Sequence, residues 1–368
     1  MQKSIPFLFM RGGSSRGPFF QRKDLPADRD VLSKVLIAAL GSGHPLNIDG
    51  IGGGNAVTTK VAILSQSRDP EVDIDYLFAQ VSVLDSLVDY KPTCGNMLAA
   101  VGPAAIEMGL MPADQTITTI RIRAVNTGAN IVVKVHTGEG QVIYDGNAKI
   151  DGVPGSAAPI EMQFLNVAGS STGSFLPTGQ TIDNIDGIEV TCMDVAMPMV
   201  IARASDFGLT GNETQDELDN NSTFFERMEK VRLAAAKKMG MGDCSKSVTP
   251  KFGIVAQNDQ INHLTVRYFM PWKTHPTLAV TGSQCMASCA LTPDTVAYSL
   301  MTKSDSIPAH LVLHHPMGTM DVITDYSLND DTFVHKSAGI IRTARKLAEG
   351  KVFVPTTIWD GGSTWRLR

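Results

Sequence analysis

Short runs of alternating or β-branched residues dominate the chain, and Gly, Pro, Asn and Asp separate one run from the next. Runs of this kind predict β-strands. The expected strands are Pro6–Met10, Val72–Val83, Thr119–Val125, Ile131–His136, Gln141–Tyr144, Ile188–Met193, Met199–Arg203, His263–Met270 and Thr319–Tyr326. Their number and spacing predict a mostly antiparallel sheet structure.

Helical periodicity is confined to a few segments. Val31–Leu40 carries apolar pairs one turn apart, with acidic residues before it and Gly41 after it, and Phe224–Met239 is a longer amphipathic segment that Gly240 ends. Two further helices are apolar and open from small polar turns, one through Leu98–Val101 and one through Val280–Ala287. Together with the strands, these helices predict an α+β fold.

The two polar turns divide the chain into similar halves. Cys94 and Thr281 lie 187 residues apart (281 − 94) in a chain of 368 residues. This spacing predicts two lobes of related build that face each other across one site. A turn-rich segment, Gln180–Gly187, suggests a boundary that gives lobes at 1–185 and 186–349, with segment 350–368 available to complete the first lobe.

Composition narrows the classes of partner. The chain is 43% hydrophobic and 19% charged, which suits a globular protein, and its net charge of −5 comes without a basic run for a nucleic acid. No apolar stretch approaches the ~18 residues of a membrane span, and the N-terminal apolar run is too short for a secretory signal. A cytoplasmic protein is expected. The five cysteines form no CxxC pair, so free thiols are expected rather than zinc ligands.

Cys94 is the first candidate for chemistry. It directly precedes Gly95, Asn96 and Met97 at a predicted helix start, where unpaired backbone N–H groups favour a thiolate or a bound carboxylate. The alternative is that the thiol is inert packing, as most buried cysteines are. Cys285 and Cys289, a helical i, i+4 pair, are expected to serve packing only.

A glycine-rich turn precedes Lys60. Residues 50–55 lack the third glycine of a dinucleotide fingerprint and the GK[ST] of a phosphate loop. They are interpreted instead as a turn that lets the backbone approach a ligand, with Gly53, Asn55 and Thr59 as contacts and Lys60 as an acid or base at a strand start. The alternative is a Lys60 side chain that extends to the solvent.

A second polar loop follows the first expected strand. Its guanidinium and hydroxyl groups, Arg11, Ser14 and Ser15, suit carboxylate binding, although a plain surface turn fits the composition equally well. His275 and Arg342 are weaker candidates of the same kind.

Several motifs together resemble the family of methylaconitate isomerases and 4-oxalomesaconate tautomerases, in order from about residue 5 to 355. The motifs are Met10–Gly17, Ile48–Gly53, Thr58–Ile63, Asp75–Val81, Cys94–Met97, Val125–Gly128, Ile150–Gly155, Leu176–Gly179 and Ile341–Arg345. The resemblance implies the diaminopimelate epimerase-like fold, in which two similar lobes each wrap a β-barrel-like sheet around a central helix, with the site in the cleft.

The resemblance also implies roles for individual residues. Lys60 and Cys94 fall on the family's acid/base positions, and Thr281 falls where diaminopimelate epimerases carry a second catalytic thiol. Stereoinversion needs an acid and a base on opposite faces, whereas groups on one face can run a 1,3 proton shift. The missing thiol therefore favours allylic isomerisation, without a metal or other cofactor. Backbone N–H groups near Gly95–Asn96 and Gly282–Ser283 are expected to hold the oxyanion.

Two classes of function are open. The first is isomerisation of an unsaturated tricarboxylate, with 4-oxalomesaconate preferred and methylaconitate as the alternative substrate. The second class is a non-catalytic acid-binding accessory protein for a dehydratase. The expected partner is a small di- or tricarboxylate, not a membrane or a nucleic acid, and a homodimer is an open expectation. The sequence leaves undecided which of Lys60 and Cys94 removes the proton.

Overall fold

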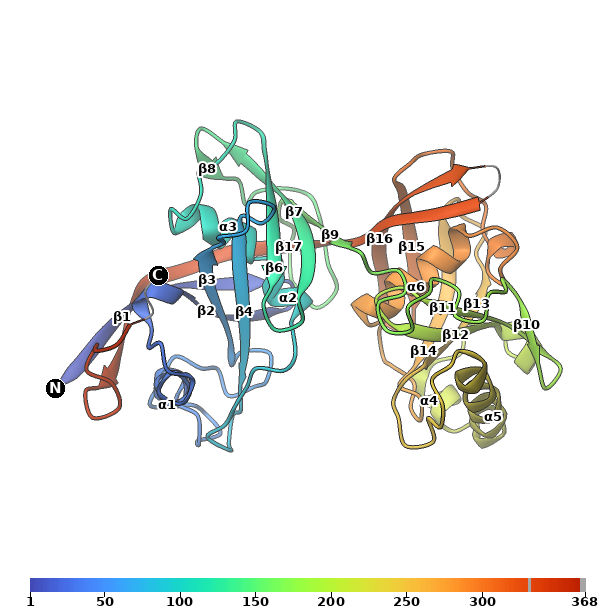
Figure 1. Cartoon of the computed structure of the whole chain (residues 1–368), viewed down its shortest axis with the longest axis horizontal. Coiled ribbons are helices and arrows are strands. Elements are labelled where there is room, and N and C mark those ends of the chain that lie inside the picture. The colour runs from blue at the N-terminus through green and yellow to red at the C-terminus, as the bar shows by residue number, and fades with distance from the viewer. Residues whose placement is uncertain (330–331, 365–368) are drawn as a thin grey trace. The chain divides into compact units, whose positions relative to one another are not determined.

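The computed structural model describes residues 1–329 and 332–364, and the chain forms two compact units (Figure 1). Unit 1 comprises Met1–Met162 and Ile341–Arg368, and unit 2 comprises Gln163–Ile340. Each unit combines a predominantly antiparallel sheet with a few helices, as the α+β pattern predicted. None of the helices in the described ranges has both the length and the apolar character needed to cross a membrane.

Unit 1 is built on a sheet whose first strand pairs with the end of the chain. Gln2 lies opposite Pro355 and Gly12 opposite Ala344, so the C-terminal segment joins the N-terminal strand. Helix α1 packs on one face of the sheet, where its residues Leu32, Val35 and Leu36 are fully buried. The elements are β1 (Gln2–Gly12), β2 (Ser15–Gln21), η1 (Arg22–Asp24), α1 (Arg29–Leu40), β3 (Lys60–Gln66), β4 (Ile74–Val81), β5 (Val88–Asp89), α2 (Gly95–Leu98), α3 (Val101–Glu107), β6 (Ile117–Ala124), β7 (Ala129–Gly138), β8 (Gln141–Val142) and β9 (Pro159–Leu165), which crosses into unit 2.

Unit 2 surrounds one central apolar helix. Every residue of α6 from Gly282 to Leu291 is buried, and this helix lies in one core of the unit, while α5 packs into a second core (Figure 1). The elements are β10 (Asp183–Ile185), β11 (Ile188–Asp194), β12 (Pro198–Arg203), η2 (Ala204–Phe207), α4 (Gln215–Asp219), α5 (Ser222–Lys238), β13 (Lys251–Gln257), β14 (His263–Phe269), α6 (Val280–Leu291), η3 (Tyr298–Leu300), β15 (Ala309–His315), β16 (Gly318–Asn329) and β17 (Thr332–Pro355), which runs on into unit 1.

The two units repeat one topology. In unit 1, parallel pairings join β2 to β3 and β4 to β6. In unit 2, parallel pairings join β12 to β13 and β14 to β15 in the same relative places. The strands between them, β3 with β4 and β13 with β14, are antiparallel hairpins. This repeat is the internal duplication that the two similar helix starts indicated.

The division between the units differs from the expected turn at Gln180–Gly187. It falls between Met162 and Gln163, and the chain returns to unit 1 at Ile341. The segment after Met162 is bound to β11, because the Asp194 carboxylate accepts from the backbone N–H groups of Ser171 and Thr172. In addition, the Thr191 hydroxyl donates a hydrogen bond to the Thr181 carbonyl. These long-range bonds make residues 163–185 part of unit 2.

The helix expected through Leu98–Val101 is divided into α2 and α3. Ala100 N–H donates to the Met97 carbonyl, a tighter turn than an α-helical one, and Pro103 follows in the first turn of α3. Proline has no N–H to donate to the carbonyl four residues earlier, and its ring crowds that carbonyl. The expectation of one continuous helix was therefore wrong, although the segment is helical and buried as expected.

Seven strands were not expected from the sequence: β2, β5, β9, β10, β13, β15 and β17. The longest of them, β17, pairs with β16 in unit 2 and with β1 in unit 1. Small, charged and apolar residues follow one another along β17 without regular alternation, because different faces of the strand are covered along its length. This pattern carries no clear period of two.

Candidate active site

The turn between β1 and β2 lies at the centre of the candidate residues of unit 1. A Cβ atom on Gly12 would lie 2.3 Å from the Asn96 carbonyl oxygen, and one on Gly17 would lie 1.7 Å from the Lys60 carbonyl oxygen. The turn thus packs directly on the start of α2 and on the start of β3. These two close approaches bring the Lys60 and Cys94 segments to the same hairpin, and they explain why glycine is required at both positions.

Lys60 begins β3 and is half-buried. Its ammonium donates to Gln80 Oε1 at 2.7 Å, and it lies 5.2 Å from the centroid of the Phe78 ring. The Gln80 amide in turn donates to the carbonyls of Ala56 and Thr59, at 3.1 and 3.3 Å. Gln80 therefore fixes both the ammonium and the loop that leads into β3. The Lys60 side chain is held in place rather than extended freely into solvent.

Cys94 is the N-cap residue of α2 and remains partly exposed. Its extended backbone gives way to the helical turn at Gly95, and its carbonyl accepts from the N–H of Leu98. The Asn96 amide, two residues along, donates to Ser14 Oγ at 3.1 Å. Ser14 and Asn96 thereby connect the β1–β2 turn to the residues that follow the thiol.

Tyr76 is a buried neighbour of Cys94. Burial raises the pKa of the Tyr76 hydroxyl well above its ordinary value, and the nearby charge of Cys94 adds to this effect. Among the described residues, this hydroxyl finds no hydrogen-bond partner. It keeps its proton at all ordinary pH values.

The two candidate arginines of unit 1 have structural contacts. Arg11 Nη1 donates to the carbonyls of Gly13 and Thr343 and to the Thr343 hydroxyl, at 2.9, 3.0 and 3.0 Å. Burial, and then the nearby Arg345 charge, lowers the pKa of Arg11. Arg342 Nη1 donates to the carbonyl of its neighbour Ile341. Arg11 thus ties the β1–β2 turn to β17.

The glycine-rich loop before β3 packs on itself and on the end of α1. A Cβ atom on Gly52 would lie 2.5 Å from the Leu40 carbonyl oxygen, and one on Gly53 would lie 2.6 Å from the Thr58 hydroxyl. Asn55 Oδ1 accepts from the Val57 N–H, and the Thr59 hydroxyl donates to the Asn55 carbonyl. The close approaches that these glycines permit are therefore made within the protein, and Gly53 and Asn55 are exposed while Thr59 is buried.

Several other candidates of unit 1 and unit 2 are buried. Ser15 lies inside β2, Met97 lies in the core, and the Ser283 hydroxyl donates to the Val280 carbonyl within the first turn of α6. A Cβ atom on Gly282 would lie 2.4 Å from the Tyr268 ring. The side chains of Ser15, Met97 and Ser283 thus support the local structure.

His275 and Thr281 are the partly exposed candidates of unit 2. The Thr281 hydroxyl contacts Met197 Sδ at 3.9 Å, as does the Tyr268 hydroxyl at 3.4 Å. His275 Nδ1 accepts from the Thr277 N–H at 3.0 Å, so the neutral ring carries its proton on Nε2. Burial lowers the pKa of His275, as does the nearby Lys251 charge, and the ring is neutral at pH 7.

Sequence reasoning did not select Gln80 or Tyr76 as site residues. Both lie on β4 within a motif that the resemblance included, and Gln80 follows Phe78 at the two-residue period of one strand face. That period was the available signal for Gln80. Tyr76 gave no signal, because a tyrosine in a strand is ordinary core material.

The remaining cysteines lie inside the cores. All five cysteines are free, and Cys192, Cys285 and Cys289 are fully buried in unit 2. Burial raises the pKa of the Cys289 thiol to about 11 and that of Cys192 to about 12. Cys94 is the most accessible of the five. Within the described ranges, no group of three or more His, Cys, Asp or Glu side chains is arranged to hold a metal ion.

Comparison with known proteins gives matches over nearly the whole chain. A family model described as PrpF protein matches residues 2–355. YbhH of Escherichia coli (strain K12) is 46% identical over 96% of this chain and 100% of its own length. The (4E)-oxalomesaconate Delta-isomerase of Novosphingobium sp. (strain KA1) is 42% identical over 95% of this chain and 98% of its own length.

A solved structure confirms the fold. The crystal structure of methylitaconate-delta-isomerase superposes with a TM-score of 0.89 at 33% identity, covering 100% of this chain and 99% of that one. The two-lobed α+β architecture implied by the resemblance, diaminopimelate epimerase-like, is therefore correct.

Proposed function

Because the chain belongs to the PrpF family and is an isomerase, we propose that it catalyses a 1,3-allylic proton shift on an unsaturated tricarboxylate, with 4-oxalomesaconate as the preferred substrate. The observation that carries this proposal is the half-buried Lys60 ammonium, which Gln80 holds at the start of β3, where this strand packs against the same β1–β2 hairpin as the segment that follows Cys94. A fixed amine and an accessible thiol whose segments pack against one hairpin supply the acid and base that such a shift requires.

The reaction moves one hydrogen and one double bond. A base removes a proton from the carbon between the alkene and an electron-withdrawing carboxylate or keto group, and the electron pair spreads over a dienolate. An acid then returns a proton to the carbon two positions away, so the substrate is neither oxidised nor reduced. We assign the proton shuttle to Lys60, with Cys94 as its partner acid or base or as a positioning group.

The developing oxyanion needs hydrogen-bond donors. The first turns of α2 and α6 carry N–H groups that have no carbonyl acceptor within the helix. These are the N–H groups of Gly95 and Asn96 in α2 and of Gly282 in α6, whereas the Ser283 N–H donates to the Ala279 carbonyl. Ser14, the neutral His275 ring and Thr281 add side-chain donors for carboxylates. Arg11, Arg342, Gly53, Asn55 and Thr59 remain proposed binding residues, and Arg11, Asn55 and Thr59 also have hydrogen bonds within the protein.

The preferred substrate of this proposal is chosen by comparing sequence identity to relatives with named substrates. The relative named for oxalomesaconate is 42% identical, whereas the solved methylitaconate isomerase is 33% identical. Methylaconitate remains the second candidate because its isomerisation uses the same proton transfer. The accessory-protein alternative is set aside, because relatives named as isomerases match across the full length.

The test incubates the purified protein with each acid in deuterated buffer. Deuterium should enter the allylic carbon of 4-oxalomesaconate as the double bond moves, and NMR follows both events. Failure of every candidate acid to exchange or isomerise would contradict the proposal. Exchange of methylaconitate alone would assign that acid as the substrate.

Variants test the assigned residues. Lys60→Ala and Cys94→Ser should each lower kcat by about 10²–10⁴, the usual worth of a general acid or base, with an unchanged circular dichroism melting curve. Lys91→Ala, which removes an exposed lysine near Cys94 in the sequence, is the matched control and should retain full activity. Near-normal turnover of either site variant would remove that residue from the mechanism.

A further inference from the structure

Strand β13 of unit 2 repeats strand β3 of unit 1. Both have seven residues, both start with lysine and end with glutamine, and their burial patterns are identical. Both are the second partner of a parallel pairing and the first strand of an antiparallel hairpin. Lys251 therefore holds in unit 2 the place that Lys60 holds in unit 1.

The neighbouring strand extends this correspondence. Lys60 lies opposite Gln80 on β4, and the Phe78 ring two residues earlier lies beneath its ammonium. In unit 2, Phe252 lies opposite Phe269, a register that sets Lys251 opposite Met270 and places Tyr268 at the Phe78 position. Where Lys60 has the Gln80 amide oxygen, Lys251 thus faces a methionine that offers no comparable acceptor.

The charge around Lys251 is not balanced by the protein. Lys251 is half-buried, and burial, together with the nearby Arg232 charge, lowers its pKa. No ion pair within residues 1–329 and 332–364 includes Lys251. A partly desolvated ammonium whose charged neighbour is a guanidinium is costly unless an anion joins it.

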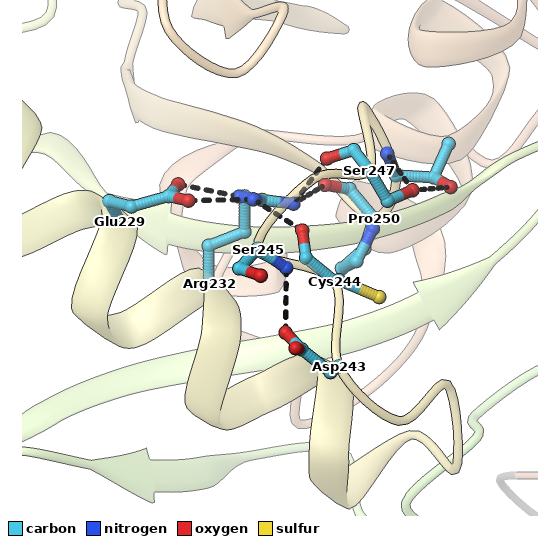
Figure 2. Close-up of polar contacts among 8 residues, drawn as sticks. Glu229, Arg232, Asp243, Cys244, Ser245, Ser247 and Pro250 are labelled. Atoms are coloured by element: carbon cyan, nitrogen blue, oxygen red, sulfur yellow. Dashed lines mark hydrogen bonds and ion pairs between the residues drawn. The ribbon is translucent and has the colours of Figure 1, made fainter.

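Glu229 does not supply that anion. Both of its carboxylate oxygens accept from Arg232, from Nε and Nη2 at 2.7 Å each (Figure 2). The remaining Arg232 donors bind the carbonyls of Cys244, Ser247 and Pro250, which are the residues leading into Lys251 (Figure 2). Arg232 is thus neutralised and fixes the backbone immediately before Lys251.

Other groups near Lys251 also donate hydrogen bonds. The Lys251 charge contributes to the lowered pKa of His275, whose neutral ring carries its proton on Nε2. The Tyr268 ring lies between this histidine, at 5.7 Å, and the first turn of α6 at Gly282, next to Thr281. An ammonium, an imidazole N–H and a hydroxyl are donors suited to a carboxylate, and the nearby Asp219 carboxylate is engaged by the Thr274 N–H at 2.8 Å.

We propose that Lys251 is a carboxylate-binding residue of unit 2, whose ammonium binds a carboxylate of the substrate. This inference rests on the proposed function for the identity of the substrate. Lys251 is assigned to binding and not to proton transfer, since the resemblance implies Thr281, whose hydroxyl does not ionise near neutral pH, at the position of a second catalytic thiol.

The test compares Lys251→Met, which keeps the length of the side chain, and Lys251→Arg, which keeps the charge, with Lys246→Met. Lys246 is an exposed lysine of the loop that leads into β13 and serves as the matched control. Two quantities are measured in the full-length protein: kcat and KM for 4-oxalomesaconate, and the Kd by calorimetry for tricarballylate, a saturated tricarboxylate that cannot isomerise.

Lys251→Met should raise KM and the tricarballylate Kd by about 10- to 100-fold while kcat changes by less than about threefold. Lys251→Arg should restore most of the binding, and Lys246→Met should match the wild type. A Lys251→Met variant that binds and turns over like the wild type overturns the proposal, as does a fall in kcat without a change in KM.

The two proposals can fail separately. Wild-type turnover with no effect of Lys251→Met on KM or Kd would refute the role of Lys251 and leave the isomerase proposal intact. Absence of turnover with a raised tricarballylate Kd in Lys251→Met would refute the assigned reaction and retain the carboxylate-binding residue. Absence of both turnover and tricarballylate binding in the wild type would refute both.

Discussion

At the scale of single residues, the proposed proton transfer depends on how one lysine is held, and Gln80 is assigned a role within that proposal. The Lys60 ammonium has a specific acceptor in Gln80, and the same amide binds the loop before β3 through the carbonyls of Ala56 and Thr59. A catalytic group must be fixed to within a fraction of an ångström to act, so such a support contributes to the rate without touching the substrate. Gln80 is therefore a positioning residue.

Replacement of this support should slow the reaction. Gln80→Leu removes the acceptor of Lys60 and two donors to the loop, and we expect kcat to fall about tenfold or more with a smaller change in KM. Steady-state kinetics measure the two parameters. Gln66→Leu removes a glutamine at the other end of β3, whose amide binds the Leu110 carbonyl, and should leave kcat unchanged. Equal effects of both variants would indicate a general loss of stability instead of a positioning role.

At the scale of elements, unit 2 depends on a buried arginine in α5. The Arg232 side chain is fully buried, pairs with Glu229, and binds three carbonyls of the segment that connects α5 to β13 (Figure 2). These three bonds tie the connection to α5 along its path. The helix therefore fixes the start of β13 and, with it, the position of Lys251.

Loss of this arginine should destabilise the protein. Arg232→Met leaves the Glu229 carboxylate without its partner and three carbonyls without donors, and we expect a loss of about 3–5 kcal/mol in the free energy of unfolding. Denaturant titration measures this loss. Arg227→Met changes an exposed arginine of the same helix, which donates to the Asp206 carbonyl, and should cost less than about 1 kcal/mol. A similar small loss for Arg232→Met would show that water replaces its contacts.

At the scale of the whole molecule, the duplication gives each unit its own core, and each core has its own sensitivity to conditions. His335, on β17 in unit 2, lies beside the rings of Phe175 and Phe333, at 6.1 and 6.4 Å. Burial lowers the pKa of His335 from 6.5 to about 4, although the Asp325 charge acts in the opposite direction. Among the described residues, its Nε2 has no hydrogen-bond partner.

This histidine should make the fold sensitive to acid. In the unfolded chain His335 takes up a proton as the pH falls below about 6.5, whereas in the folded chain it stays neutral until about pH 4. Folding is thus favoured above pH 6.5, and up to about 3 kcal/mol of stability is lost as the pH falls from 6.5 to 4. His335→Leu should reduce this loss in urea titrations at both pH values. An unchanged difference between the two pH values would contradict the assignment.

The sequence by itself determined many of the strands and the main helices, that two related halves exist, and which motifs identify the family. These properties are local or repeated: the periodicity of α1 and α5 reflects burial of one face, and the polar turns at Cys94 and Thr281 are visible without knowledge of their surroundings. The proton-transfer candidates followed from those same motifs, because reactive residue types stand out in the sequence.

Tertiary structure alone decided what these residues contact. The boundary after Met162 depends on hydrogen bonds from residues 171 and 172 to Asp194, and the support of Lys60 depends on Gln80, twenty residues away. Strand β17 is defined by pairing with strands more than three hundred residues earlier as well as with its neighbour β16. Such pairings are set by burial and hydrogen bonding between distant segments, and no local pattern encodes which partner a strand will find.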